Sequence, residues 1–298
     1  MNRIAIIGGG SVGLLYAARL ASYHEVTVYT KSNEQARAIN EKGIQLEEGE
    51  QINVIRVKAA VISDGIAPCN LAVIAVKQYH LSSILPFLRE IPPTTPLLFL
   101  QNGMSHLEII DSLPHTYVFL GLVEHGALKT GDVHVKHTGI GTTRLCMYKE
   151  NHFIHRELLK NSTDCFSFVE EHDWYKTMIK KLIVNAVINP LTALYRVENG
   201  MLPSVAPFRQ NMEQLFAEVV LSLGINEGKE YWESILTVCE QTAFNRSSML
   251  RDIESKRQTE VDSILGYIIS EGERRRVDVP LATFLYNSIK GLEKKQKK

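Results

Sequence analysis

Short apolar runs in the first half of the chain alternate with polar or glycine-rich turns, as in buried strands joined by helices. Runs of this kind cover residues 3–7, 25–30, 71–76 and 97–100. Each is rich in β-branched or leucine residues and is followed by polar positions, which is typical of strands in an α/β sheet. From residue 121 to 147, turn residues alternate with β-branched ones. That pattern predicts antiparallel strands that finish the sheet.

The strand pattern stops near Trp174, and helical periodicity dominates the rest of the chain. Prolines at 190, 203, 207 and 280 are expected to break these helices. We therefore predict two domains, an α/β domain over residues 1–172 and an all-α domain over residues 173–298.

One segment of the helical half carries a polar line through an otherwise apolar helix. Lys181, Asn185 and Asn189 lie four residues apart, so they share one helix face, and the positions between them are apolar. An ammonium group and two amides inside a packed domain cost free energy unless partners satisfy them. The line is expected to face a cleft or a bound ligand, and an internal hydrogen-bond network that joins helices is the structural alternative.

The first predicted strand runs directly into a glycine-rich turn and then into a helical stretch. The turn comprises Gly8, Gly9, Gly10, Ser11, Val12 and Gly13. Gly8 permits the tight turn, Gly10 lets backbone amides approach a pyrophosphate, and Gly13 lets the helix pack closely on the strand. Strand, turn and helix in this order predict a dinucleotide-binding site.

The end of the second predicted strand indicates which dinucleotide is preferred. An NAD site usually places Asp or Glu there to accept a hydrogen bond from the ribose 2′-hydroxyl. This chain has Tyr29, Thr30, Lys31 and Ser32 instead. Lys31 can neutralise a 2′-phosphate, so the sequence favours NADP(H) over NAD(H).

Polar residues also follow the next two predicted strands. Lys77 and Gln78 follow one, and Gln101, Asn102 and Gly103 follow the other. Ligands of open α/β sheets bind beyond the carboxyl ends of the strands. Asn102 is therefore expected to contact the nicotinamide or the substrate rather than only to form a turn. Lys77 is either a second contact of this kind or an ordinary exposed lysine at a strand end.

Composition removes several classes of function. The chain has 33 basic and 33 acidic residues, so it lacks an overall positive field that would attract nucleic acid or an anionic membrane. Its four cysteines stand far apart, without metal-site spacing. No apolar run approaches the ~18 residues of a membrane span. We expect a cytoplasmic protein without a metal, a nucleic-acid partner or a membrane segment, and the basic run at 294–298 is expected to be a solubilising tail.

A second polar segment lies in the last third of the chain. Taken alone, Ser247 or Ser248 would ordinarily cap a helix. Glu260 would ordinarily be a solvated acid near a helix start, where a negative charge is favourable.

Five groups of residues along the chain form a set of motifs: GGGSVG at 8–13, VKQ at 76–78, QNGM at 101–104, KLIVNAVINPLTAL at 181–194, and RSSML with QTEVD in the last third. Together these motifs resemble those of the ketopantoate reductase (2-dehydropantoate 2-reductase) family. The block at 181–194 is far more specific than the glycine turn, which many dehydrogenases share. The resemblance implies a Rossmann-type α/β N-terminal domain followed by an all-α C-terminal domain, as in 6-phosphogluconate dehydrogenase-like proteins.

The resemblance also implies roles for individual residues. Lys181 would be the general acid that protonates the carbonyl oxygen while NADPH delivers a hydride to the adjacent carbon, and Glu260 would hold the substrate hydroxyl and help position the lysine. An ammonium group near the carbonyl both stabilises the developing alkoxide and supplies the proton. Substrate contacts would come from Asn102, Asn185, Asn189 and Ser248, with Asn199 as a further contributor. Asn102 and Glu260 would also contact the cofactor.

The predicted function is NADPH-dependent reduction of 2-dehydropantoate to (R)-pantoate, a step of pantothenate and coenzyme A biosynthesis. Two alternatives remain: a related NADP-dependent reductase of another small 2-oxo acid, and an NADP(H)-sensing protein without turnover. A homodimer is also left open, because an amphipathic helix such as 208–223 serves an interface or a core equally well.

Overall fold

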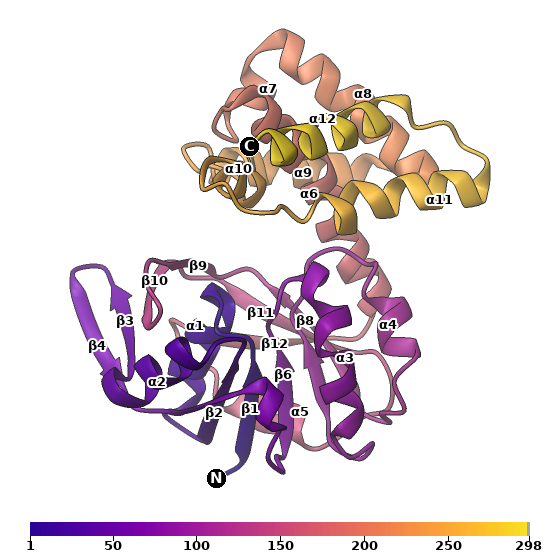
Figure 1. Ribbon diagram of the computed structural model, residues 1–298. Coiled ribbons are helices and arrows are strands. Elements are labelled where there is room, and N and C mark those ends of the chain that lie inside the picture. The colour runs from indigo at the N-terminus through magenta and orange to yellow at the C-terminus, as the bar shows by residue number, and fades with distance from the viewer. Residues whose placement is uncertain (297–298) are drawn as a thin grey trace. The chain divides into compact units, whose positions relative to one another are not determined.

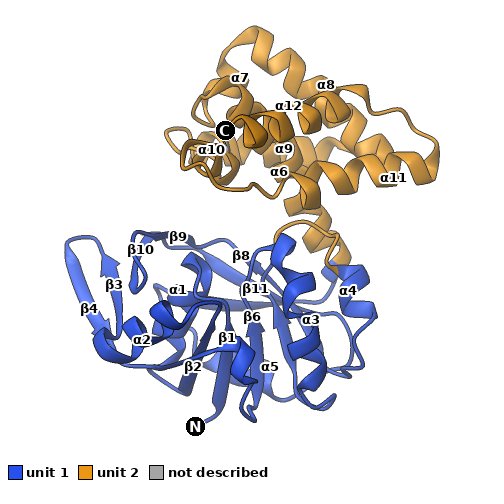
Figure 2. Ribbon diagram, in the orientation of Figure 1, with its two compact units in different colours: residues 1–101, 107–174 blue, residues 102–106, 175–298 orange. Residues whose placement is uncertain are grey.

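The computed structural model describes residues 1–296 (Figure 1). The last two lysines of the predicted basic tail lie outside the described residues. Contacts divide the chain into two compact units, coloured separately in Figure 2. Unit 1 comprises residues 1–101 and 107–174, and unit 2 comprises residues 102–106 and 175–298. Within residues 1–296, no helix combines the length and the apolar character that crossing a membrane requires.

Unit 1 is built on an eight-stranded sheet with strand order β12-β11-β8-β7-β6-β1-β2-β5. Its strands are β1 (Arg3–Ile7), β2 (Glu25–Thr30), β5 (Lys58–Val61), β6 (Leu71–Ile74), β7 (Leu97–Phe99), β8 (Val118–Val123), β11 (Thr142–Met147) and β12 (Ser167–Glu171). All neighbouring pairs are parallel except β8 with β11. The four predicted strands are confirmed, and the third and fourth end one or two residues earlier than expected.

A second, four-stranded sheet belongs to the same unit and was not anticipated. Its order is β4-β3-β10-β9, and its strands are β3 (Ile44–Glu48), β4 (Gln51–Ile55), β9 (Gly126–Lys129) and β10 (His134–Gly139). The prediction that residues 121–147 finish the main sheet is therefore right for the antiparallel pair β8 and β11 and wrong for β9 and β10. Alternation along a strand defines its faces but not the strand with which it pairs, and β10 pairs with the distant β3.

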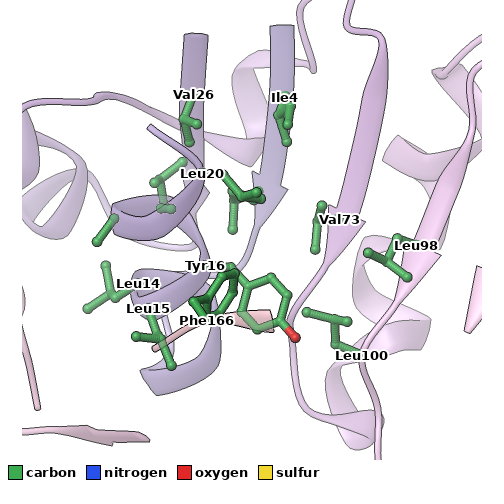
Figure 3. Close-up of a cluster of buried hydrophobic side chains, with 14 of the residues drawn as sticks. Ile4, Leu14, Leu15, Tyr16, Leu20, Val26, Val73, Leu98, Leu100 and Phe166 are labelled. Carbon is green, nitrogen blue, oxygen red and sulfur yellow. The ribbon is translucent and has the colours of Figure 1, made fainter. Parts of the chain in front are cut away.

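Helix α1 (Ser11–Leu20) packs against both sheets of unit 1. Seven of its ten residues are buried. A helix that is buried on most sides needs apolar residues almost all round, as the stretch after the glycine turn has. Figure 3 shows Leu14, Leu15, Tyr16 and Leu20 within the buried cluster. The other helices of unit 1 are α2 (Asn33–Lys42), η1 (Ile62–Asp64), η2 (Gln78–His80), α3 (Leu81–Glu90), α4 (Leu107–Asp111) and α5 (Ile154–Lys160).

Unit 2 is helical. Its elements are α6 (Trp174–Tyr195), α7 (Met201–Ser204), α8 (Ala206–Ser222), α9 (Lys229–Gln241), α10 (Ser248–Glu254), the π turn η3 (Asp262–Gly266), α11 (Tyr267–Arg275) and α12 (Pro280–Gln296). The α/β domain followed by a helical domain confirms the predicted fold class.

The expected break at Pro190 is wrong, because α6 continues through it to Tyr195. A proline inside a helix removes one backbone hydrogen bond and crowds the preceding turn. Every residue from Ala186 to Ala193 is buried. Packing on all sides therefore holds the helix together where its own hydrogen bonding is weakened. Pro280 instead begins α12, a position where its missing N–H has no cost.

Candidate active site

The glycine turn between β1 and α1 has two kinds of glycine. Gly8 has φ +116°, and a Cβ on Gly13 would lie 1.9 Å from the carbonyl oxygen of Gly8. Gly13 is therefore required by the packing of the turn itself. Gly10, in contrast, has an extended backbone, and a Cβ there would meet no atom of the described residues within 4 Å. The protein supplies no reason for glycine at position 10, whereas a pyrophosphate lying over the turn does.

The first turn of α1 is suited to an anion. Ser11 and Val12 begin the helix, and Gly10 is its N-cap residue. Among the described residues, no side chain caps this end and no acid lies in its first turn. Its first backbone N–H groups therefore keep their hydrogen-bonding capacity, and the helix dipole favours negative charge there. The residues of the turn fit a bound dinucleotide.

Positive charge gathers beyond the ends of β2 and β6. Lys31 follows β2 and is exposed, and Lys77 follows β6 and is half-buried. Desolvation, together with the charges of Lys31 and Lys77, lowers the pKa of His80. Two lysines that are 46 residues apart thus act on one imidazole. Such a cluster can neutralise a phosphate, as the predicted NADP(H) site requires.

Gln101 connects the ends of strands β6 and β7 through hydrogen bonds of its side chain. Its side-chain amide donates to the carbonyl oxygens of Ile74 (2.9 Å) and Val76 (2.8 Å). The side chain is buried, with 5% exposure. Gln101 therefore ties the end of β7 to the end of β6, next to Lys77.

The polar line predicted on the helical half lies on α6. Asn189 is buried, and Lys181 and Asn185 are half-buried, whereas the intervening positions are mostly buried apolar residues. Four-residue spacing puts the three side chains on one face over about 12 Å of helix. The partly open state of Lys181 and Asn185 leaves one stretch of this line accessible from solvent.

Asn102 and Glu260 meet although 158 residues separate them. The amide nitrogen of Asn102 donates to Glu260 Oε2 at 3.1 Å. The segment that carries Asn102, residues 102–106, belongs to unit 2, although the elements before and after it in the chain, strand β7 and helix α4, belong to unit 1 (Figure 2). Gly103 explains how closely it packs: φ is +79°, and a Cβ there would lie 2.2 Å from the carbonyl oxygen of Ser263 in the π turn η3. Single π turns often occur at functional sites.

Two serines at the start of α10 have different roles. Ser247 is the N-cap, and its hydroxyl accepts from the backbone N–H of Leu250 at 3.1 Å. Ser248 is exposed, and Asn189 donates its amide N–H to the Ser248 hydroxyl at 3.5 Å. The capping interpretation is therefore right for Ser247, whereas Ser248 joins the polar line of α6.

Asn199 lies apart from these contacts. Its amide donates to the Thr242 hydroxyl at 2.8 Å, and its backbone N–H donates to the Asn245 carbonyl at 3.0 Å. Both bonds hold the connection after α6 against the turn after α9. The described contacts thus join Asn102 with Glu260 and Asn189 with Ser248, and they give Asn199 a structural task. The substrate roles of all five stay predictions.

Sequence reasoning missed two features of this site. One is the close approach of Gly103 to Ser263, which depends on a contact that no local pattern announces. The other is Glu293, which accepts two hydrogen bonds from Thr259, next to Glu260. A signal for Glu293 did exist, because it follows Leu285 and Ile289 at four-residue steps and so places an acid on the buried face of α12.

Among the described residues, no group of three or more His, Cys, Asp or Glu side chains is arranged to hold a metal ion.

Comparisons with known proteins agree with the geometry of both units. Residues 4–150 match the family "Ketopantoate reductase PanE/ApbA", and residues 173–293 match its C-terminal counterpart. The 2-dehydropantoate 2-reductase of Bacillus subtilis is 40% identical, with 99% of each chain covered.

Solved structures show the same fold over the full length. A probable 2-dehydropantoate 2-reductase from Bacillus subtilis superposes with a TM-score of 0.89 at 41% identity, covering 97% of this chain and 99% of the other. A D-mandelate dehydrogenase with NADH and anilino(oxo)acetate also reaches 0.89, at 22% identity and with coverage of 99% and 100%. The matches of both halves confirm the resemblance drawn from the sequence motifs, and this chain belongs to the ketopantoate reductase family.

Proposed function

We propose that this protein reduces 2-dehydropantoate to pantoate with NADPH, and that the polar line of α6 carries the chemistry. The observation on which this rests is the half-buried ammonium group of Lys181, in line with two amides on an otherwise apolar helix. The 2-dehydropantoate 2-reductases that cover the whole chain support the substrate. Family membership confirms the predicted oxidoreductase class and its cofactor class, NADP(H).

Bound NADPH supplies a hydride to the carbonyl carbon of the 2-oxo acid. The chain's own groups deal with the charge that this creates. Lys181 is proposed to hydrogen-bond the carbonyl oxygen, stabilise the developing alkoxide and release a proton to it, which yields the hydroxyl of the product. The glycine turn lies in unit 1, and Lys181 lies in unit 2.

The neighbouring polar groups are proposed to orient the substrate. Asn185, Asn189 and Ser248 can donate hydrogen bonds to a carboxylate without adding a second positive charge beside the carbonyl. Glu260 can accept a hydrogen bond from the substrate hydroxyl with one carboxylate oxygen while the other accepts from Asn102. In this proposal these groups bind and orient the substrate, and Lys181 is the proton donor.

On the nucleotide side, we assign the pyrophosphate to the turn at Gly8–Gly13 and the 2′-phosphate to Lys31. Lys77 would complete the positive cluster around His80. A small-molecule substrate and cofactor are the partners that this assignment needs. Cytoplasmic location and a homodimer stay predictions, and light scattering coupled to size-exclusion chromatography measures the second directly.

The test is oxidation of NADPH by the purified protein, followed by absorbance, with 2-dehydropantoate and with a panel of other 2-oxo acids. NADH replaces NADPH in a parallel series. We expect NADPH-preferring turnover of 2-dehydropantoate. Faster turnover of another 2-oxo acid would move the substrate but keep the mechanism, whereas tight NADPH binding without any turnover would favour a sensing protein.

A further inference from the structure

The last helix of unit 2 carries a buried glutamate that the proposed mechanism does not use. Glu293 on α12 is 8% exposed, and it follows the buried residues Leu285 and Ile289 on the same helix face. A carboxylate in such a place costs free energy unless strong hydrogen bonds satisfy it. Its partners therefore indicate why an acid occupies this position.

The main partner of Glu293 is Thr259, the residue before Glu260. Glu293 Oε1 accepts from the backbone N–H of Thr259 at 2.7 Å and from the Thr259 hydroxyl at 2.6 Å. The same hydroxyl accepts from the backbone N–H of Val261 at 3.2 Å. Thr259 is fully buried. One carboxylate thus fixes the backbone on both sides of Glu260, through hydrogen bonds of the strong, charge-assisted kind.

Two more residues of α12 contact the same segment. Lys290 Nζ lies 2.8 Å from Asp262 Oδ2, and the Tyr286 hydroxyl donates to Asp262 Oδ1 at 2.8 Å. Lys290 Nζ is also 3.5 Å from Glu293 Oε2. The side chain of Asp262 is 44% exposed, so its ion pair contributes little. Glu293, which is far more buried, is the dominant link between α12 and residues 259–262.

We infer that Glu293 is a positioning residue, which holds Glu260 where it accepts the amide of Asn102 and meets the substrate. This inference rests on the proposed function, because it takes Glu260 to be a substrate contact. Glu293 itself does not touch the reacting atoms. It acts through Thr259 on the direction in which the Glu260 side chain leaves the backbone.

A second buried glutamate in unit 2, Glu218, provides a matched control for substitution of Glu293. Glu218 on α8 is 9% exposed, and it accepts from the backbone N–H groups of Leu281 (3.0 Å) and Ala282 (2.9 Å) at the start of α12. Glu218→Ala and Glu293→Ala therefore each remove one buried carboxylate and leave two donors without their acceptor. Both should lower the melting temperature of the protein.

Steady-state kinetics distinguish the two variants when they are measured well below the melting temperatures of both. We expect Glu293→Ala to lower kcat/KM for the 2-oxo acid by about tenfold, because small displacements of a binding group are costly to the rate. Glu218→Ala should leave kcat/KM unchanged. Glu293→Gln should recover most of the loss, since its amide oxygen still accepts from Thr259.

A double-mutant cycle tests whether Glu293 acts through Glu260. In the Glu260→Ala background, Glu293→Ala should cause no further loss of kcat/KM. A tenfold loss that persists in that background, or wild-type kcat/KM in Glu293→Ala, would overturn the inference.

Hydrogen exchange gives a readout that does not need turnover. Backbone amides at 102–106 and 259–263 should exchange faster in Glu293→Ala than in Glu218→Ala. If the wild-type protein turned over no 2-oxo acid, the proposed function would fail, and exchange would still decide the positioning. Equal exchange of these segments in the two variants would refute it.

Discussion

Gly103→Ala tests the packing of the Asn102 segment against the π turn. In the native protein a Cβ at this position would lie 2.2 Å from the carbonyl oxygen of Ser263. Ordinary contact begins at 3.4 Å, so the two backbones must separate by about 1.2 Å. Asn102 is the adjacent residue, and its hydrogen bond to Glu260 is 3.1 Å long. A displacement of that size breaks the bond.

The expected magnitudes follow from this displacement. The backbone of Gly103 has φ +79°, and an L-residue in left-handed conformation costs about 1–2 kcal/mol. The steric overlap adds to that cost. Misplacing a binding group by about 1 Å can reduce a rate by on the order of 100-fold. We therefore expect kcat/KM for the 2-oxo acid to fall by about 10- to 100-fold, with a loss of a few kcal/mol of stability.

The assay compares Gly103→Ala with Gly49→Ala. Gly49 also has positive φ, +59°, but a Cβ there would meet no described atom within 4 Å. Gly49→Ala therefore introduces the backbone strain without the overlap. It should lower the unfolding free energy by about 1 kcal/mol and leave NADPH-dependent turnover unchanged. Urea titration and steady-state kinetics measure the two effects separately.

One result would refute the reasoning. If Gly103→Ala kept wild-type kcat/KM and lost no more stability than Gly49→Ala, the close approach to Ser263 would not position Asn102. The functional role of the pair Asn102 and Glu260 would then need another basis.

Three further predictions concern other parts of the protein. Lys181→Ala should reduce kcat by orders of magnitude and leave the melting temperature and NADPH affinity nearly unchanged; a large drop in melting temperature with intact turnover would favour the structural network instead. Gly10→Ala should weaken NADPH binding in calorimetry without unfolding the protein, whereas Gly13→Ala should disrupt the turn itself, since its Cβ would lie 1.9 Å from a backbone oxygen. Burial lowers the pKa of His106 from 6.5 to about 4. The unfolded chain therefore binds a proton that the folded chain resists, and the unfolding free energy should fall by about 3 kcal/mol as the pH falls from 6.5 to 4, with a slope that reaches about 1.4 kcal/mol per pH unit in the middle of that range. Urea titrations of wild type and His106→Leu measure that share.

Local patterns were enough for four parallel strands of the main sheet, β1, β2, β6 and β7, and for the glycine turn, because their periodicity and turn chemistry come from neighbouring residues. The same holds for the polar line on α6, which needs only helical spacing. Strands β5 and β12 of the main sheet were not predicted. Pro190 misled because burial of the surrounding residues outweighs its local effect. Helical spacing therefore placed the polar line on one helix correctly, but the proline signal misplaced the end of that helix.

Contacts between residues that lie far apart in the chain could not be predicted from the sequence. Nothing near Asn102 indicates that it meets Glu260, and nothing near Thr259 indicates that Glu293, 34 residues later, accepts its hydrogen bonds. The second sheet was missed for the same reason, since β3 pairs with β10 across about 90 residues. Contacts of this kind are set by tertiary packing rather than by local propensity.

The chain passes between the two units three times, at residues 101–102, 106–107 and 174–175. The helical unit is therefore not a portable C-terminal module. A fragment that begins at residue 175 lacks Asn102, the amide that Glu260 accepts from, and lacks Gly103 against the π turn. A chimera that exchanges helical units between relatives has to carry two insertions, the long C-terminal segment and the five residues 102–106. If only the C-terminal segment is exchanged, the donor Asn102 and the acceptor Glu260 come from two different parent proteins.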